Sequence, residues 1–361
     1  MNKRYFRLWA CCCAHVGTDL RASGRESLAE AIRQTENDSS GFEWDIAVHL
    51  GDLSGSQTPP EDEEGKEVVR QFSSLKKHAR EHFYNIAGNH DASPNQRWFR
   101  RWVDPLGENT RFSLVDASKR PYPIEGTWER YSFRVGNVLF LMMSDRNDLE
   151  PPVGRLITRK DEQHGGYPAG AVTSETFSWW RRKVEENPDA IIITAHHHML
   201  KETTVASGPW EGFERDEGGR WRPHYHGYFA NGAPEGASYL YFVDRKRDAQ
   251  AFERYLAAHP GAIDLWLGGH THTYPDDNKG GRSHIERKWG VNFINVAALT
   301  RHHGRKELCI PMSRLLTFKE GAKECRVQCY LHTSDYAPQG WYTPAERVLR
   351  LSKPFRRREV E

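Results

Sequence analysis

Residues with metal-binding side chains follow five apolar segments of this chain. Each segment is rich in aliphatic and aromatic residues, which predicts a buried β-strand. The residues at the segment ends carry thiol, imidazole, carboxylate or amide groups, and they are Cys13, His15, Asp52, Asn89, His196, His270 and His272. Because strand ends on one edge of a sheet converge in space, we expect these side chains to form one site.

This combination of groups suits the hydrolysis of a phosphate ester. The reaction needs charge neutralised on the phosphoryl oxygens and a nucleophile available near neutral pH. Two metal ions about 3.5–4 Å apart supply both. Such a pair needs a bridging carboxylate, and Asp52 is the natural candidate. A histidine that binds no metal can protonate the leaving oxygen, and His90 is placed for that role.

Four short motifs resemble the signature of the calcineurin-like metallophosphoesterase family. They are Gly51-Asp52, Gly88-Asn89-His90-Asp91, His196-His197 and Gly269-His270-Thr271-His272, in this order along the chain. The resemblance extends from about residue 6 to about residue 299. It implies a four-layer α/β/β/α sandwich with a two-metal site at the carboxyl ends of the strands. This agrees with the alternation of apolar and amphipathic segments, which is typical of layered α/β proteins.

The resemblance also implies a role for each site residue. The first ion would be held by His15, Asp52 and His272, and the second by Asp52, Asn89, His196 and His270. His90 would be the proton donor, with Asp91 as its supporting partner. Of the three consecutive histidines, we favour His196 because family members usually bind through the first histidine after the strand. His197 is the alternative.

Cys13 departs from the family pattern, which has an aspartate at this position. As a thiolate ligand of the first ion, Cys13 would favour Zn or Fe over Mg or Mn. Alternatively, Cys13 is a small buried residue and the first ion is weakly held. We expect two divalent or mixed-valence transition metals: Zn, Fe or Mn. Strand alternation predicts that Cys11 shares the face of Cys13 and that Cys12 packs on the other face.

The remaining segments predict a single domain over residues 1–361. We expect a β-rich segment at 131–143 and helices from Ser23 through Ile32, at 61–81, at 174–186 and at 249–258. Long insertions at about 147–175 and 200–248 are predicted to form walls of a substrate pocket. A β-rich extension is expected from about residue 305.

Composition limits the partners and the compartment. The chain has 51 Lys and Arg residues against 49 Asp and Glu residues, so the sequence gives no strong signal for nucleic acid. No segment approaches the roughly 20 apolar residues of a membrane span. The three adjacent cysteines do not form a disulfide framework, which favours reduced thiols and a cytoplasmic location.

These observations favour an enzyme that hydrolyses a small-molecule phosphate ester, and a phosphodiester in particular. The alternatives are a phosphomonoesterase and a non-catalytic, metal-stabilised scaffold or binding protein. Arg301 is a candidate phosphate partner. His224 and His226 are either substrate contacts or surface residues.

Overall fold

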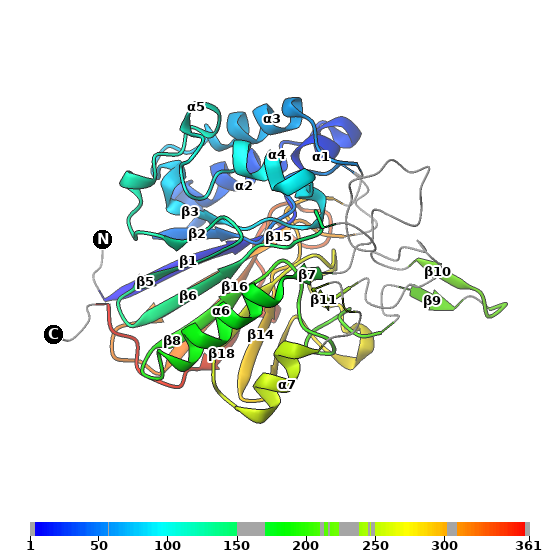
Figure 1. Cartoon of the computed structure of the whole chain (residues 1–361). Coiled ribbons are helices and arrows are strands. Elements are labelled where there is room, and N and C mark those ends of the chain that lie inside the picture. The colour runs from blue at the N-terminus through cyan, green and yellow to red at the C-terminus, as the bar shows by residue number, and fades with distance from the viewer. Residues whose placement is uncertain are drawn as a thin grey trace.

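Two seven-stranded sheets pack face to face, and helices cover both outer faces (Figure 1). The computed structural model describes residues 4–56, 58–149, 170–209, 213–215, 217–223, 238–244, 246, 250–301 and 309–357. The four-layer α/β/β/α sandwich expected from the sequence is confirmed. No helix within these residues is long and apolar enough to cross a membrane.

The first sheet has the order β17-β16-β15-β1-β2-β3, and β18 also pairs with β16. Its strands are β1 (Tyr5–Cys11), β2 (Ile46–His49), β3 (Phe83–Asn85), β15 (Met312–Lys319), β16 (Glu324–Leu331), β17 (Gly340–Trp341) and β18 (Arg347–Arg350). The pairs β1/β2 and β2/β3 are parallel, so their carboxyl ends meet at one edge. β15 pairs antiparallel with β1, so the C-terminal strands complete this sheet.

The second sheet has the order β13-β14-β12-β8-β6-β5-β4. Its strands are β4 (Glu125–Gly126), β5 (Arg130–Val135), β6 (Val138–Met143), β8 (Ile191–Ala195), β12 (Leu265–Gly268), β13 (Ile285–Lys288) and β14 (Val291–Asn295). The central strands β6, β8, β12 and β14 are parallel. Two small sheets pair β7 (Gly170–Val172) with β11 (Leu240–Val243), and β9 (Phe213–Arg215) with β10 (Trp221–Pro223).

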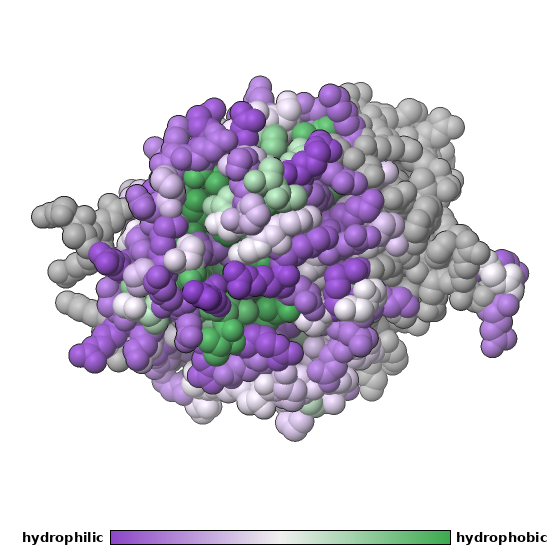
Figure 2. Space-filling model, turned by 90° about the horizontal axis from the view of Figure 1, so that it is seen from below, coloured by the Kyte–Doolittle hydropathy of each residue, from purple (hydrophilic) through white to green (hydrophobic). Residues whose placement is uncertain are grey.

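Seven α-helices lie in the described residues and form the two outer layers (Figure 1). They are α1 (Val16–Ser23), α2 (Ser27–Thr35), α3 (Asp62–Phe72), α4 (Arg97–Trp102), α5 (Thr110–Ser113), α6 (Ser174–Glu185) and α7 (Ala251–Ala258). Helices α1 to α5 lie over the first sheet, and α6 and α7 cover the second. The face seen in Figure 2 is largely hydrophilic, and apolar residues show only in limited areas.

Alternate side chains of β1 point to opposite faces of the sheet and so contribute to two hydrophobic cores. Phe6 and Leu8 point into the core between the sheets, whereas Trp9 and Cys11 pack under the helices of the first sheet. A third core joins α6 and α7 to the second sheet and includes Trp180. The site at the strand ends is therefore carried by strands that are buried on both faces.

Several segments differ from the sequence expectation. The helix expected from Ser23 begins at Ser27 as α2, because Ser23 is the last residue of α1 and Gly24, with φ 68°, ends that helix. The helix expected at 61–81 ends at Phe72, since the following residues turn back to bind the Glu36 carboxylate. The β-rich segment at 131–143 is a hairpin that turns at Gly136, with φ 57°. The insertions at about 147–175 and 200–248 lie partly outside the described residues.

Candidate metal centre

The loops that follow β1, β2 and β3 are tied together by backbone hydrogen bonds. The N–H of Cys13 donates to the carbonyl of Gly51 at 2.9 Å, and that of His15 donates to the carbonyl of Asp52 at 3.1 Å. One Asp52 carboxylate oxygen, Oδ1, accepts from the N–H of His90 at 2.7 Å. The other oxygen, Oδ2, is left to face the neighbouring imidazoles.

Asp91 holds the second and third of these loops. Its carboxylate accepts from the backbone N–H groups of Asp52 at 2.9 Å, Ser54 at 2.9 Å and Gly88 at 2.8 Å. Asp91 therefore contacts the loop that carries His90 through backbone groups. The ring of His90 instead has its Nδ1 2.8 Å from the carbonyl oxygen of Ser56.

Two glycines allow these loops to approach so closely. A Cβ atom on Gly51, which has φ 95°, would lie 2.4 Å from the backbone nitrogen of Gly88. A Cβ atom on Gly88 would lie 2.3 Å from Oδ1 of Asp52. Any side chain at either position would force the loops apart.

Oδ2 of Asp52 lies at the centre of the cluster. It is 3.5 Å from Nε2 of His15, 3.1 Å from Nε2 of His197 and 4.0 Å from Sγ of Cys13. Two atoms bound to one zinc ion, at about 2.0–2.3 Å each, lie no more than about 4.6 Å apart. All three distances are compatible with metal ions that share the Asp52 carboxylate.

Two further groups of ligand atoms flank Asp52. Cys13, His15 and His272 form one, and His197, His198 and His270 form the other; within each group the ligand atoms lie within 4.8 Å of one another. Nδ1 of His270 is 3.3 Å from Nε2 of His197. Nitrogens at about 2.0–2.1 Å from one tetrahedral ion are about 3.3–3.4 Å apart, so this spacing fits adjacent ligands.

Buried polar atoms without a hydrogen-bond partner also fit a metal site around Asp52. Nε2 of His15 and both amide atoms of Asn89 are buried and have no hydrogen-bond partner among the described residues. Such groups destabilise a protein unless something binds them. The donor set of thiol, imidazole, carboxylate and amide therefore fits transition metals.

The backbone at the site is strained. Cys13, His15, Asp52 and His270 have φ angles of 52°, 45°, 58° and 66°, in the left-handed region that non-glycine residues rarely adopt. Strain of this kind, on the order of 1–3 kcal/mol per residue, clusters at functional sites. Four of the seven ligands expected from the sequence carry it.

Within the histidine run, His197 faces Asp52 and His196 does not. Nδ1 of His196 accepts from the N–H of His198 at 3.0 Å, and its Nε2 lies 3.8 Å from Oδ2 of Asp145. Burial lowers the pKa of His196 to about 3, so its ring is neutral. The geometry favours the second histidine of the run over the first.

Charge around Asp52 keeps its carboxylate ionised. Burial alone would raise the pKa of Asp52, but the charges of His197 and His90 hold it well below its usual range. Burial and the nearby Asp52 charge together raise the pKa of Asp91. Of the two carboxylates, Asp52 is therefore the one that favours the ionised form.

Cys12 lies closer to the site than strand alternation predicts. β1 ends at Cys11, which packs on the opposite side of the sheet, and the left-handed turn at Cys13 brings Cys12 and Cys13 to the same core. Sγ of Cys12 is 3.3 Å from Sγ of Cys13 and 3.4 Å from Nδ1 of His197. Although burial opposes the shift, the hydrogen bond with Cys13 and the charge of His197 lower the pKa of Cys12 to about 6.

Asp145 was missed by the sequence reasoning. It is fully buried, and its Oδ2 lies 3.4 Å from Nδ1 of His198 and 3.8 Å from Nε2 of His196. The sequence does show the same pattern there: Asp145 comes shortly after the apolar strand β6, as Asp52 comes shortly after β2.

Arg301, the candidate phosphate partner, forms an ion pair with Asp335 at 2.7 Å. His224 and His226 lie outside the described residues.

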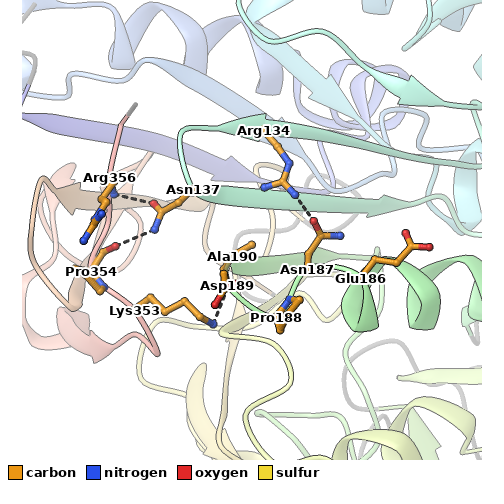
Figure 3. Close-up of a pocket in the computed structure, with 10 residues that line it drawn as sticks. All are labelled: Arg134, Asn137, Glu186, Asn187, Pro188, Asp189, Ala190, Lys353, Pro354 and Arg356. Atoms are coloured by element: carbon orange, nitrogen blue, oxygen red, sulfur yellow. Dashed lines mark hydrogen bonds between the residues drawn. The ribbon is translucent and has the colours of Figure 1, made fainter. Parts of the chain in front are cut away.

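A separate pocket of about 540 Å³ lies at the other end of the sandwich (Figure 3). It is lined by the turn at Asn137, the segment that precedes β8, and the C-terminal residues Lys353, Pro354 and Arg356. Its polar groups bond to one another: Asn137 Nδ2 donates to the Pro354 carbonyl at 2.9 Å, and Lys353 Nζ donates to the Ala190 carbonyl at 3.1 Å. We interpret this region as an anchor for the C-terminal segment.

A family model for calcineurin-like phosphoesterases matches residues 6–274. The chain therefore belongs to the calcineurin-like phosphoesterase family. The family supports a metal-dependent phosphoester hydrolase, consistent with the ligand groups around Asp52. No curated protein matches the chain.

Two solved structures are similar over most of this chain. Haemophilus influenzae NAD nucleotidase (NadN) shares 10% identity and covers 96% of this chain, with a TM-score of 0.41. The chain spans about half of that protein, 49% of its length. Chaetomium thermophilum Vps29 shares 8% identity and covers 97% of this chain and 97% of its own length, with a TM-score of 0.28. Likenesses this low carry no argument about function.

Proposed function

We propose that this protein is a dinuclear-metal-dependent hydrolase of a small-molecule phosphodiester. The observation that carries the proposal is the position of Oδ2 of Asp52, 3.5 Å from Nε2 of His15 and 3.1 Å from Nε2 of His197. A carboxylate between two imidazoles that come from different sheets suits a bridge between two ions.

The proposed ligand set follows the sequence expectation with one change. The first position uses Cys13, His15, Asp52 and His272, and the second uses Asp52, Asn89, His197 and His270. His197 replaces His196 because its Nε2 lies 3.3 Å from Nδ1 of His270. The metals are two divalent or mixed-valence transition ions, and the thiol of Cys13 favours Zn or Fe.

When bound, the ions supply positive charge for the phosphoryl oxygens and a nucleophile near neutral pH. His90 is the proposed proton donor to the leaving oxygen. The hydrogen bond from its Nδ1–H to the Ser56 carbonyl orients the ring, so Nε2 of the doubly protonated imidazolium is the atom that delivers the proton. Asp91 holds the loop on which His90 lies.

The substrate class rests on the motifs and on composition. The Gly88–Asp91 motif is the form that resembles small-molecule diesterases, and the nearly balanced charge gives no support for a nuclease. A phosphomonoesterase uses the same site chemistry and is the second candidate. The six free cysteines, all buried, are consistent with a cytoplasmic location, which we also propose.

The proposal is tested with bis(p-nitrophenyl) phosphate and p-nitrophenyl phosphate, after reconstitution with Zn, Fe or Mn. We expect metal-dependent turnover with preference for the diester. Preference for the monoester would select the second candidate. No turnover by folded protein that binds both metals would favour the non-catalytic scaffold.

A further inference from the structure

Three imidazoles gather at the second metal position, although the proposed set uses only two of them. The ligand nitrogens of His197, His198 and His270 all lie within 4.8 Å of one another. The ring of His198 lies 4.0 Å from that of His270, centroid to centroid, and 4.8 Å from that of His197. All three are fully buried.

Asp145 and Gly170 lie beside the Nδ1 edge of the His198 ring. Nδ1 of His198 lies 3.4 Å from Oδ2 of Asp145. The Asp145 carboxylate is itself oriented by the N–H groups of Ala171 at 3.0 Å and Asn147 at 2.8 Å. A Cβ on Gly170 would lie 2.7 Å from Cγ and 2.8 Å from Nδ1 of His198, so only glycine allows this packing.

A carboxylate beside one ring nitrogen is the arrangement that orients metal-binding histidines. The carboxylate accepts the N–H of one nitrogen and raises the basicity of the other. A purely structural imidazole at this depth would need only hydrogen-bonding partners. His198 has, in addition, two imidazoles of the metal centre within ligand spacing.

We propose that His198, oriented by Asp145, is a third imidazole ligand at the second metal position. The inference rests on the proposed function and adds a ligand to it. With His197, His198 and His270, this position is rich in nitrogen. It therefore favours Zn or Fe over Mn or Mg.

The experiment titrates metal-free protein with Co²⁺ and follows both the affinity of each equivalent and the visible absorption of bound Co²⁺. In His198→Gln we expect the Co²⁺ affinity of the second metal position to fall at least 10-fold and the spectrum of that ion to change. The Co²⁺ affinity of the first metal position should stay the same. Asp145→Asn removes the orienting charge and should weaken the same equivalent by about 10–100-fold.

His332→Gln is the matched control. His332 is buried like His198, but its nitrogens pair with Ser313 at 2.8 Å and Gln34 at 2.7 Å. Its replacement should leave both Co²⁺ equivalents unchanged. Circular dichroism checks the folding of each variant.

If His198→Gln fails to fold, the unaltered protein still tests the inference. Loaded with Co²⁺, it should show a hyperfine-shifted N–H signal that disappears in Asp145→Asn. An unchanged second equivalent in folded His198→Gln, or the absence of such a signal, overturns the inference and leaves the proposed function standing. Failure of the unaltered protein to bind two ions would overturn the proposed function first.

Discussion

At the scale of single residues, the site depends on a buried carboxylate that remains charged. Asp52 has no exposed surface, yet the charges of His197 and His90 keep its pKa low. Its backbone is strained at φ 58°, and the N–H group at His90 fixes its Oδ1. One residue thus combines strain, charge and orientation, which is typical of a side chain kept for binding.

His90→Ala tests the proposed proton donor. We expect the rate of ester hydrolysis to fall by roughly 10²–10⁴-fold, because a positioned general acid contributes about that much. Metal content should stay the same, since His90 is outside the proposed ligand set. The measurement pairs steady-state kinetics with metal analysis, and loss of a metal in this variant would make His90 a ligand instead.

Cys13→Asp tests the proposed thiolate ligand. The substitution restores the carboxylate of the family pattern and should shift metal preference from Zn or Fe towards Mn, a harder ion. Competition between Zn and Mn, followed by metal analysis, measures the shift. Cys11→Ser is the control, because Cys11 packs on the opposite side of the sheet and should leave the preference unchanged. Equal preference in Cys13→Asp and the unaltered protein would indicate that Cys13 is only a packing residue.

At the scale of elements, strand ends were predictable and side-chain direction at those ends was not. Asp52 and Asn89 could be placed from sequence, because the change from apolar to polar residues marks where a strand stops. The choice between His196 and His197 as the ligand could not be made from the sequence. β8 ends at Ala195, but the N–H of His196 still bonds to β12, and a shift of one residue reverses the face.

Glu36→Gln tests the hydrogen bonds between the Glu36 carboxylate and the segment that follows α3. Although burial opposes it, hydrogen bonds from the backbone N–H groups of Lys76, Lys77 and His78 lower the pKa of Glu36. This stabilisation is therefore present above the unfolded pKa, about 4.3, and is lost as pH falls through the lower folded value.

We expect Glu36→Gln to lower the free energy of unfolding by about 1–3 kcal/mol at pH 7, because bonds to a charged group are lost. The difference from the unaltered protein should shrink below about pH 4. Urea unfolding at pH 7 and at a pH below about 4 measures the difference in the free energy of unfolding. Glu185→Gln, at an exposed helix end, should change stability by less than about 0.5 kcal/mol. A pH-independent difference would contradict the charge argument.

At the scale of the whole molecule, the candidate ligands join the two sheets. Cys13, His15 and Asp52 follow strands of the first sheet, and His197 and His270 follow strands of the second. Elsewhere the sheets meet mainly through apolar packing. Bound ions would therefore add a link between layers at the edge where the chemistry is proposed.

Metal removal tests this link. A ligand that binds only the folded state stabilises it by about 2.7 kcal/mol at 100 times its Kd. Two such sites should raise the Tm by several degrees, and a chelator should reverse the rise. Calorimetry of metal-free protein with increasing Zn²⁺ measures the effect. Asp52→Asn should lose most of it, because both positions share that carboxylate, whereas the His332→Gln variant should keep it in full. A Tm that does not depend on metal in the unaltered protein would mean that no ion bridges the two sheets.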